Sequence, residues 1–157
     1  MKKILYALSI IFLFISCKKP PEPDGDIADT VTGKYLFVYV DRFLGVDSEY
    51  TVVWTIKKAS DNEVSLKHEI VEKIIGLNPN GYEPSDPFVG TITGIKITDI
   101  GKLKVDQTVD FTFDGVKENA KLFIDGIVNG NSLNVNLKQT TLSDNATLSD
   151  SFVFKRQ

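Results

Sequence analysis

Hydrophobic and polar residues alternate with a period of two over most of the chain after residue 32. Such alternation is typical of β-strands with one face buried and one face in water, because successive side chains point to opposite faces. It predicts eight strands, at residues 35–41, 50–57, 64–70, 88–98, 105–113, 122–128, 133–138 and 152–154.

Short turn signals separate most of these strands. Asp61-Asn62 and Asn129-Gly130-Asn131 are the clearest, since both sequences suit tight hairpins. Gly90 and Gly94 fall on one face of a single strand, where glycines usually mark the bends that a small barrel needs. We therefore expect an all-β fold of about eight antiparallel strands in an up-and-down meander, closed into a barrel, with a β-sandwich as the alternative.

Residues 67–76 fit two structures. Their apolar positions lie four apart, and Glu69 and Lys73 have the spacing of a helical ion pair. We expect the strand to continue to about Ile70 and the remainder to be irregular or to form one or two helical turns.

The first sixteen residues have the pattern of a signal peptide. Lys2 and Lys3 precede an uninterrupted apolar run over residues 4–15. That run is shorter than the roughly 20 residues that a membrane-spanning helix requires. We expect residues 1–16 to be removed on export.

Cys17 is the only cysteine of the chain and directly follows this run. Residues 13–17, ending in the small Ser16 and Cys17, resemble the lipobox of bacterial lipoproteins. The resemblance implies cleavage before Cys17, lipid attachment at Cys17, and anchoring in the outer membrane, with the domain facing the periplasm or the cell surface. Lys18 agrees with that location, since Asp at this position favours inner-membrane retention in the family.

Residues 17–32 are rich in proline and acidic side chains, which predicts a flexible tether behind the lipid. Within it, Asp29-Thr30-Val31 resembles the O-glycosylation motif of Bacteroidetes-type bacteria, which implies a sugar on Thr30. The remaining residues, 33–157, are expected to form the β-domain.

The charge of the chain disfavours nucleic acid as a partner. All 21 acidic residues follow Cys17, so loss of Lys2 and Lys3 lowers the formal net charge from −3 to −5. The basic residues are scattered rather than clustered, and a nucleic-acid surface needs a basic patch. The expected contact with a membrane is through the lipid on Cys17.

Two short motifs at the ends of the β-domain carry a second resemblance. Gly33-Lys34-Tyr35 opens the first strand and Arg156 ends the last. This arrangement resembles the small lipocalin-like (calycin) lipoproteins of Bacteroidetes-type bacteria, whose Gly-x-Trp motif is crossed by an Arg. The resemblance implies a lipocalin-like barrel in which Arg156 stacks on Tyr35 and closes the barrel, as a cation–π contact.

Residues for catalysis and metal binding are few. His68 is the only histidine, and a lipidated Cys17 is no nucleophile. The acidic stretches near residues 24–29 and 78–86 lack the spacing of a calcium loop. We therefore expect no catalytic residue, no metal, no cofactor and no enzymatic activity.

The remaining hypotheses concern binding. A lipid-anchored module could hold a small apolar ligand in its barrel, with Trp54 and His68 as contact residues. Tyr82, in the loop 77–87, is a further candidate for contact with a ligand or partner. The many bulky residues favour a barrel filled by side chains, and with it the alternative of a protein-interaction, inhibitor or structural accessory lipoprotein.

Overall fold

The structure is a computed structural model, and it describes residues 26–43, 45–76, 81–113 and 116–157. It consists of one short 3-10 helix and eight strands: η2 (Ile27–Thr30), β1 (Gly33–Phe43), β2 (Val46–Ser60), β3 (Glu63–Ile74), β4 (Phe88–Lys96), β5 (Lys102–Phe113), β6 (Val116–Asn129), β7 (Ser132–Thr141) and β8 (Thr147–Arg156). Among the described residues, no helix has the length and apolar character needed to cross a bilayer.

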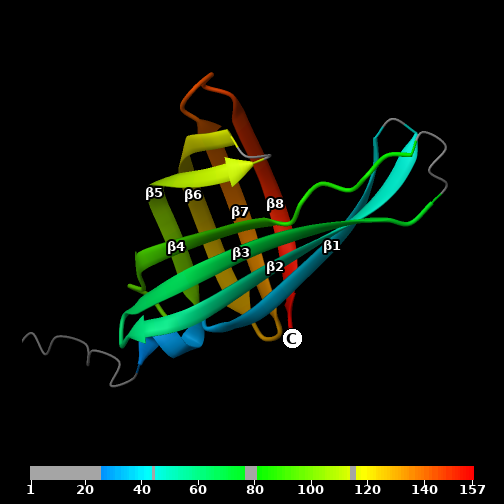
Figure 1. The fold of residues 1–157 in the computed structure, drawn as a ribbon. Helices are drawn as coiled ribbons and strands as arrows, with labels where there is room; N and C mark the ends of the chain where they lie inside the picture. The colour runs from blue at the N-terminus through cyan, green and yellow to red at the C-terminus, as the bar shows by residue number, and fades with distance from the viewer. Residues whose placement is uncertain (1–25, 44, 77–80, 114–115) are drawn as a thin grey trace, which may run out of the picture.

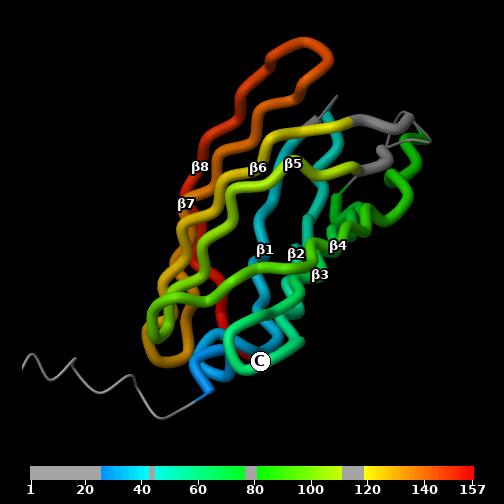
Figure 2. Tube along the Cα trace, turned by 90° about the vertical axis from the view of Figure 1, so that its left-hand side faces the viewer, coloured from blue at the N-terminus to red at the C-terminus, as the bar shows by residue number. Residues whose placement is uncertain are grey.

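The eight strands form one antiparallel sheet in the order β4-β3-β2-β1-β8-β7-β6-β5. Every strand pairs with its neighbour in sequence except β4 and β5, and β1 also pairs with β8. The sheet therefore curls into a nearly closed barrel, with β4 and β5 facing each other across the gap (Figures 1 and 2). The predicted all-β meander is confirmed, as a barrel rather than a β-sandwich.

Strand β3 extends through the segment whose structure was ambiguous. It runs from Glu63 to Ile74 and pairs with β2 over its whole length, up to Ser48 opposite Ile74. The expectation of irregular or helical structure after Ile70 is wrong, because pairing with a long neighbouring strand overrides a weak helical spacing. Glu69 forms its ion pair with Lys67 at 2.8 Å.

The last part of the expected tether belongs to the domain. Residues Ile27–Thr30 form η2, in which Ala28 is fully buried, as is the following Val31. The Ala28 N–H donates to the Asp61 carbonyl oxygen at 3.0 Å, which fixes η2 against the turn between β2 and β3. The prediction of a flexible tether that extends to residue 32 is therefore wrong for residues 27–31, because apolar side chains of this segment enter the core.

The end of the barrel that holds η2, here called the closed end, contains most of the fully buried core. Gly94, with a φ of +70°, makes a bulge in β4 that turns both Ile92 and Ile95 inward. The closed end is packed by side chains that are at most 2% exposed, namely Ala28, Val31, Tyr35, Ile95, Ile97, Leu103, Leu133 and Phe154.

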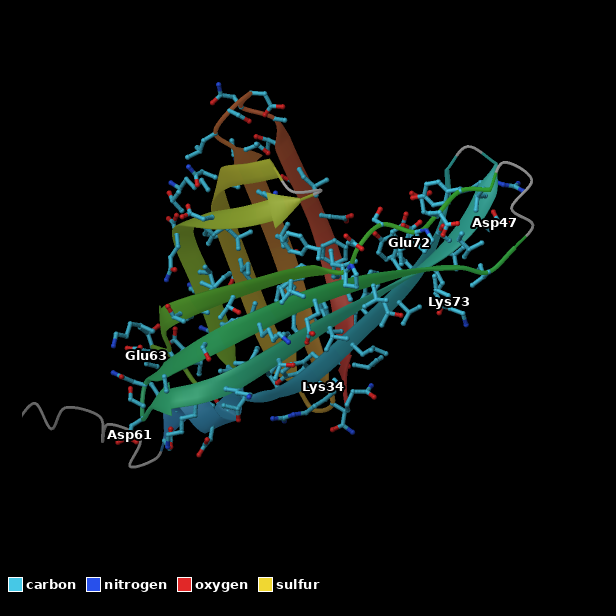
Figure 3. All side chains as sticks on the ribbon, viewed as in Figure 1. Lys34, Asp47, Asp61, Glu63, Glu72 and Lys73 are labelled. Carbon is cyan, nitrogen blue, oxygen red and sulfur yellow. The ribbon has the colours of Figure 1, made fainter. Side chains whose placement is uncertain are left out.

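The opposite end, here called the open end, contains Glu72 and the loop that follows β3. Figure 3 shows Asp61 and Glu63 at the closed end and Asp47 and Glu72 at the far end of the long β2–β3 hairpin. Since η2 precedes β1 at the closed end, the chain enters the barrel at the end away from Glu72 (Figure 3).

Candidate ligand-binding cavity

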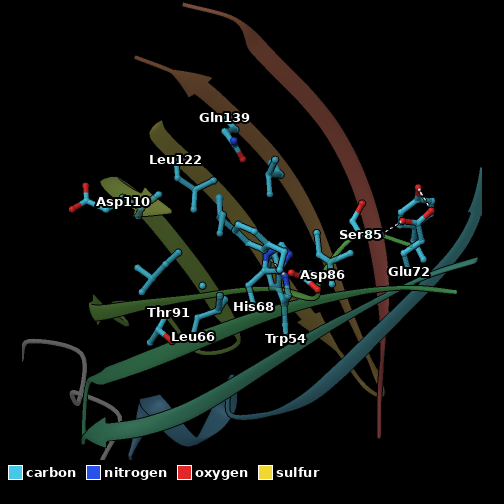
Figure 4. Close-up of a pocket in the computed structure, with 18 of the residues that line it drawn as sticks. Trp54, Leu66, His68, Glu72, Ser85, Asp86, Thr91, Asp110, Leu122 and Gln139 are labelled. Carbon is cyan, nitrogen blue, oxygen red and sulfur yellow. Dashed lines mark hydrogen bonds between the residues drawn. The ribbon is translucent and has the colours of Figure 1, made fainter. Parts of the chain in front are cut away.

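The barrel contains a cavity of about 400 Å³ between its centre and the open end (Figure 4). Residues of strands β1 to β7 line it, and most of them are apolar or aromatic. The aromatic lining residues are Tyr39, Tyr50, Trp54 and Phe88; the aliphatic ones are Leu66, Ile70, Ile92, Val109, Leu122, Ile124 and Leu137. This volume lies within the range of about 300–1,000 Å³ that is typical of small-molecule sites.

The expectation of a barrel filled by side chains is wrong. One of the bulky residues, Phe123, points outward and is 44% exposed. At the inner wall, Gly90 lies directly opposite His68 in the β3–β4 pairing and contributes no side chain. The wall at this position is formed by the Phe88 ring, which lies 3.5 Å from where a Cβ of residue 90 would be.

Trp54 and His68 are cross-strand neighbours on β2 and β3, and both line the cavity. The Trp54 Nε1–H donates a hydrogen bond to His68 Nδ1 at 3.2 Å. The Trp54 ring also packs on Phe154, at 4.6 Å between ring centroids, and the His68 ring meets Phe88 edge to face at 5.5 Å. Both rings are thus held in place by partners on neighbouring strands.

The hydrogen bond from Trp54 fixes the protonation state of His68. Because Nδ1 accepts a hydrogen bond, the neutral imidazole carries its proton on Nε2. Burial lowers the pKa of His68 to about 4, so the ring is neutral at physiological pH. Nε2 is buried and has no hydrogen-bond partner among the described residues.

Glu72, at the open end, accepts hydrogen bonds from four donors. The hydroxyls of Tyr50 and Tyr82 lie 3.0 Å and 3.2 Å from its carboxylate, and the Ser85 backbone N–H lies 2.9 Å away. The hydroxyl of the buried Ser48 is the fourth donor. Glu72 therefore ties the loop that contains Tyr82 and Ser85 to strands β2 and β3.

These hydrogen bonds change the acidity of the groups that make them. Burial acts to raise the pKa of Glu72, but the donors from Ser85, Ser48, Tyr50 and Tyr82 outweigh it and lower that pKa. Burial and the hydrogen bond to Glu72 raise the pKa of Tyr50 to about 12. At physiological pH the cluster therefore contains an ionised Glu72 and a neutral Tyr50.

The charged groups that line the cavity are all acidic. Glu72, Asp86 and Asp110 line its open end, and Asp86 and Asp110 are exposed there. Neither Lys nor Arg occurs among the described lining residues, and the one histidine, His68, is neutral. The cavity is consequently apolar inside and negatively charged at its mouth.

Tyr82 lies beside the cavity rather than in its wall. It is half-buried and is not a lining residue of the cavity; its hydroxyl is engaged with Glu72. Its hydrogen bond to Glu72 helps to hold the loop in which Ser85 and Asp86 line the mouth of the cavity. Tyr82 therefore supports the site indirectly.

The Tyr35–Arg156 contact is present at the closed end. Cζ of Arg156 lies 5.6 Å from the centroid of the Tyr35 ring, and the two residues are paired between β1 and β8. The Arg156 guanidinium also donates to the Thr32 carbonyl oxygen, and the Tyr35 hydroxyl donates to the Val31 carbonyl oxygen at 3.0 Å. Gly33 leaves room for Arg156, since a Cβ at Gly33 would lie 2.8 Å from Arg156 Nε.

Thr30, also singled out by the sequence, lies away from the cavity. The Thr30 hydroxyl donates to the Ile27 carbonyl oxygen at 2.6 Å and accepts from the Gly101 N–H at 2.8 Å. This hydroxyl links η2 to the turn before β5, and a sugar on it would break the link. Cys17 lies outside the described residues.

The polar residues of the mouth were not anticipated from the sequence. Glu72, Asp110 and Gln139 line the cavity from β3, β5 and β7, which are far apart in the chain. One signal was available: Glu72 has the same strand parity as His68 and Ile70, which places its carboxylate on the inner face.

Comparisons with protein-family models, with curated proteins and with solved structures found no significant match to this chain. Within the described residues, no three His, Cys, Asp or Glu side chains converge on a position suited to a metal ion. The interpretation of the site therefore depends on its geometry.

Proposed function

We propose that this chain is a lipid-anchored, non-catalytic binding protein whose lipocalin-like barrel holds a small, largely apolar ligand. The observation that carries the proposal is the cavity of about 400 Å³, with its apolar and aromatic wall. Burial of apolar ligand surface in such a wall contributes about 25 cal/mol per Å². Affinity would thus come from shape and burial, with a few polar groups setting orientation.

The surroundings of His68 favour binding over catalysis. A general base needs a free nitrogen within hydrogen-bond reach of the substrate proton. In this chain, the basic nitrogen of the only histidine accepts the Trp54 N–H. Glu72 is likewise engaged by four donors, and its lowered pKa makes it a weak base at neutral pH.

The outer face of the barrel offers less support for a protein-interaction role. Ile127 and Val153 are about half exposed, but Asn134 separates them in the strand register. Val38 and Val71 are similarly separated by Thr51. Apolar positions interleaved with polar ones do not form the contiguous patch that is typical of a stable interface.

The position of the chain entry agrees with a tethered receptor. Asp26 and η2 lie at the closed end, whereas Ser85 and Asp86 lie at the mouth. If lipid on Cys17 anchors the chain, the tether holds the closed end towards the bilayer and the cavity opens away from it.

The proposal is tested by filling the cavity. Gly90 does not have a positive φ, and a Cβ there makes only an ordinary contact with Phe88 at 3.5 Å, so Gly90→Leu adds volume to the cavity wall without a backbone clash at Cβ. We expect the chain that starts at residue 17, with Cys17→Ser, to bind the apolar fluorophore N-phenyl-1-naphthylamine. Gly90→Leu should abolish the fluorescence increase.

Val89→Leu is the matched control, because Val89 is adjacent and points outward, 52% exposed. It should bind the fluorophore as the unmodified barrel does. Equal binding by Gly90→Leu and the unmodified barrel would contradict the proposal, since the fluorophore would then sit elsewhere.

A further inference from the structure

The inner wall of the cavity contains one buried polar group whose hydrogen-bonding capacity is unused. His68 Nε2 must carry the ring proton, because Nδ1 accepts from Trp54 Nε1 at 3.2 Å. Nε2 is buried and lacks a hydrogen-bond partner among the described residues. A buried donor without an acceptor destabilises the folded protein, because it has lost its hydrogen bonds to water. His68 itself lines the cavity, so the missing acceptor can come from a ligand that displaces the side chains covering Nε2.

The position of His68 defines where that acceptor would lie. Leu66 and Ile70 flank His68 on the inner face of β3, and Gly90 lies opposite it on β4. All of these residues line the cavity. A ligand oxygen near His68 would therefore be surrounded by apolar groups, below the polar mouth.

The charges at the mouth restrict the ligand further. Glu72, Asp86 and Asp110 are the charged lining residues, and neither Lys nor Arg is present among the described ones. A carboxylate or phosphate in the cavity would lose its hydration without gaining a cationic partner. It would also be repelled by the acidic mouth. An anionic ligand is therefore disfavoured at both ends of the cavity.

We propose that the ligand is an uncharged molecule with an apolar body and a hydrogen-bond acceptor, such as a carbonyl, ester or ether oxygen, that takes the hydrogen bond of His68 Nε2–H. This inference rests on the proposed binding function and names its ligand class. It separates this cavity from one built for fatty-acid anions.

Three probes of similar size and different polarity test the inference: butylbenzene, butyrophenone and 4-propylbenzoate. They present no acceptor, an uncharged carbonyl and a carboxylate, respectively. The indole N–H signal of Trp54 in a nitrogen–proton correlation spectrum is the readout, because Trp54 is the only tryptophan and lines the cavity. Titrations at pH 7.5 give a Kd for each probe.

Variants of His68 isolate the hydrogen bond. His68→Phe keeps a ring of similar shape but has no N–H, whereas His68→Gln keeps both a donor and an acceptor. We expect the preference for butyrophenone over butylbenzene to fall by about three- to tenfold in His68→Phe, and to persist in His68→Gln. A preference that is unchanged in His68→Phe would overturn the assignment of the donor.

The unmodified protein supplies an independent measurement should His68→Phe not fold. The His68 Nε2–H proton should shift downfield on addition of butyrophenone and not on addition of butylbenzene. An identical response to both probes would mean that the carbonyl does not reach His68.

A second set of variants tests whether the acidic mouth disfavours anionic ligands. We expect 4-propylbenzoate to bind at least about tenfold more weakly than butyrophenone, and Asp86→Asn combined with Asp110→Asn to reduce that difference. Asp106→Asn is the control, since Asp106 is an exposed residue of β5 outside the cavity lining.

If butylbenzene and butyrophenone bind and 4-propylbenzoate binds equally well, the ligand class is wrong while the proposed function stands. If none of the three binds, the proposed function itself fails.

Discussion

The two ends of this barrel are built by the same strands but differ in what fills them. At the closed end the inner face is packed by fully buried aliphatic and aromatic side chains, and η2 covers it. At the open end, the inner positions of the same strands carry half-buried residues such as Ile70, Glu72 and Gln139, around empty space. Period-two alternation therefore specifies the strands of the barrel, and the residue types on its inner face determine which half is packed by side chains and which half contains a cavity.

The two ends also differ in how they are held together. The closed end depends on apolar packing, with Arg156 stacked over Tyr35. The open end depends on polar contacts that converge on Glu72. Apolar packing is largely independent of pH, whereas a carboxylate cluster is not. We therefore expect the closed end to supply most of the stability and the open end to respond more to conditions.

The largest expected effect comes from truncating one leucine of β7 at each end. Leu133 is fully buried at the closed end, so Leu133→Ala should lower the free energy of unfolding by about 2–5 kcal/mol. Leu137 lines the cavity and is only half-buried, so Leu137→Ala should cost about 1 kcal/mol. Urea unfolding measures both; equal losses would contradict the difference between the ends.

Acidification should weaken the fold through His68. Its pKa falls from an ordinary 6.5 to about 4 in the folded state, so the unfolded chain binds more protons between these values. The free energy of unfolding should therefore be highest above pH 6.5 and fall by about 1.4 kcal/mol per pH unit towards pH 4.

The variant His68→Gln isolates this contribution, because it removes the titrating ring and leaves the other groups in place. The difference in unfolding free energy between the unmodified protein and His68→Gln should change with pH only in the window from about 4 to 6.5. A difference that is constant across this window would show that His68 titrates normally.

The stacking of Arg156 on Tyr35 should contribute a smaller amount. Arg156→Ala removes the cation–π contact and the hydrogen bond to Thr32, which together are worth about 1–2 kcal/mol. Lys155→Ala is the matched control, because Lys155 is the exposed neighbour on β8, and it should change stability by less than about 0.5 kcal/mol. Thermal unfolding compares the two variants, and equal shifts in Tm would contradict a stabilising role for the contact between Arg156 and Tyr35.

The smallest global effect is expected at Glu72. Glu72→Gln removes the charge that its donors stabilise, and should lower the unfolding free energy by about 0.5–1 kcal/mol. Its local effect should be clear: amide hydrogen exchange of residues 81–87 should accelerate, while exchange in β7 stays unchanged. Unchanged exchange in residues 81–87 would mean that Glu72 does not hold this loop.

Much of the fold could be predicted from the sequence, because the inner face of each strand is marked by every second residue. Trp54 and His68 fall on that face, so their place in the cavity followed from parity. The cavity itself did not follow, since parity marks the inner face but does not say that Gly90 is paired with His68 on the neighbouring strand. The mouth was missed because Glu72, Asp110 and Gln139 come to line one cavity only once the barrel closes.

The central claim, a ligand inside the open half of the barrel, is tested most directly by native mass spectrometry of residues 17–157. The chain carries Cys17→Ser, is exported in its own host behind a cleavable signal peptide, and is purified without detergent. We predict a one-to-one complex with an uncharged small molecule, lost in Gly90→Leu and kept in Val89→Leu. The same spectrum for all three proteins, whether ligand-free or carrying the same adduct, would contradict it.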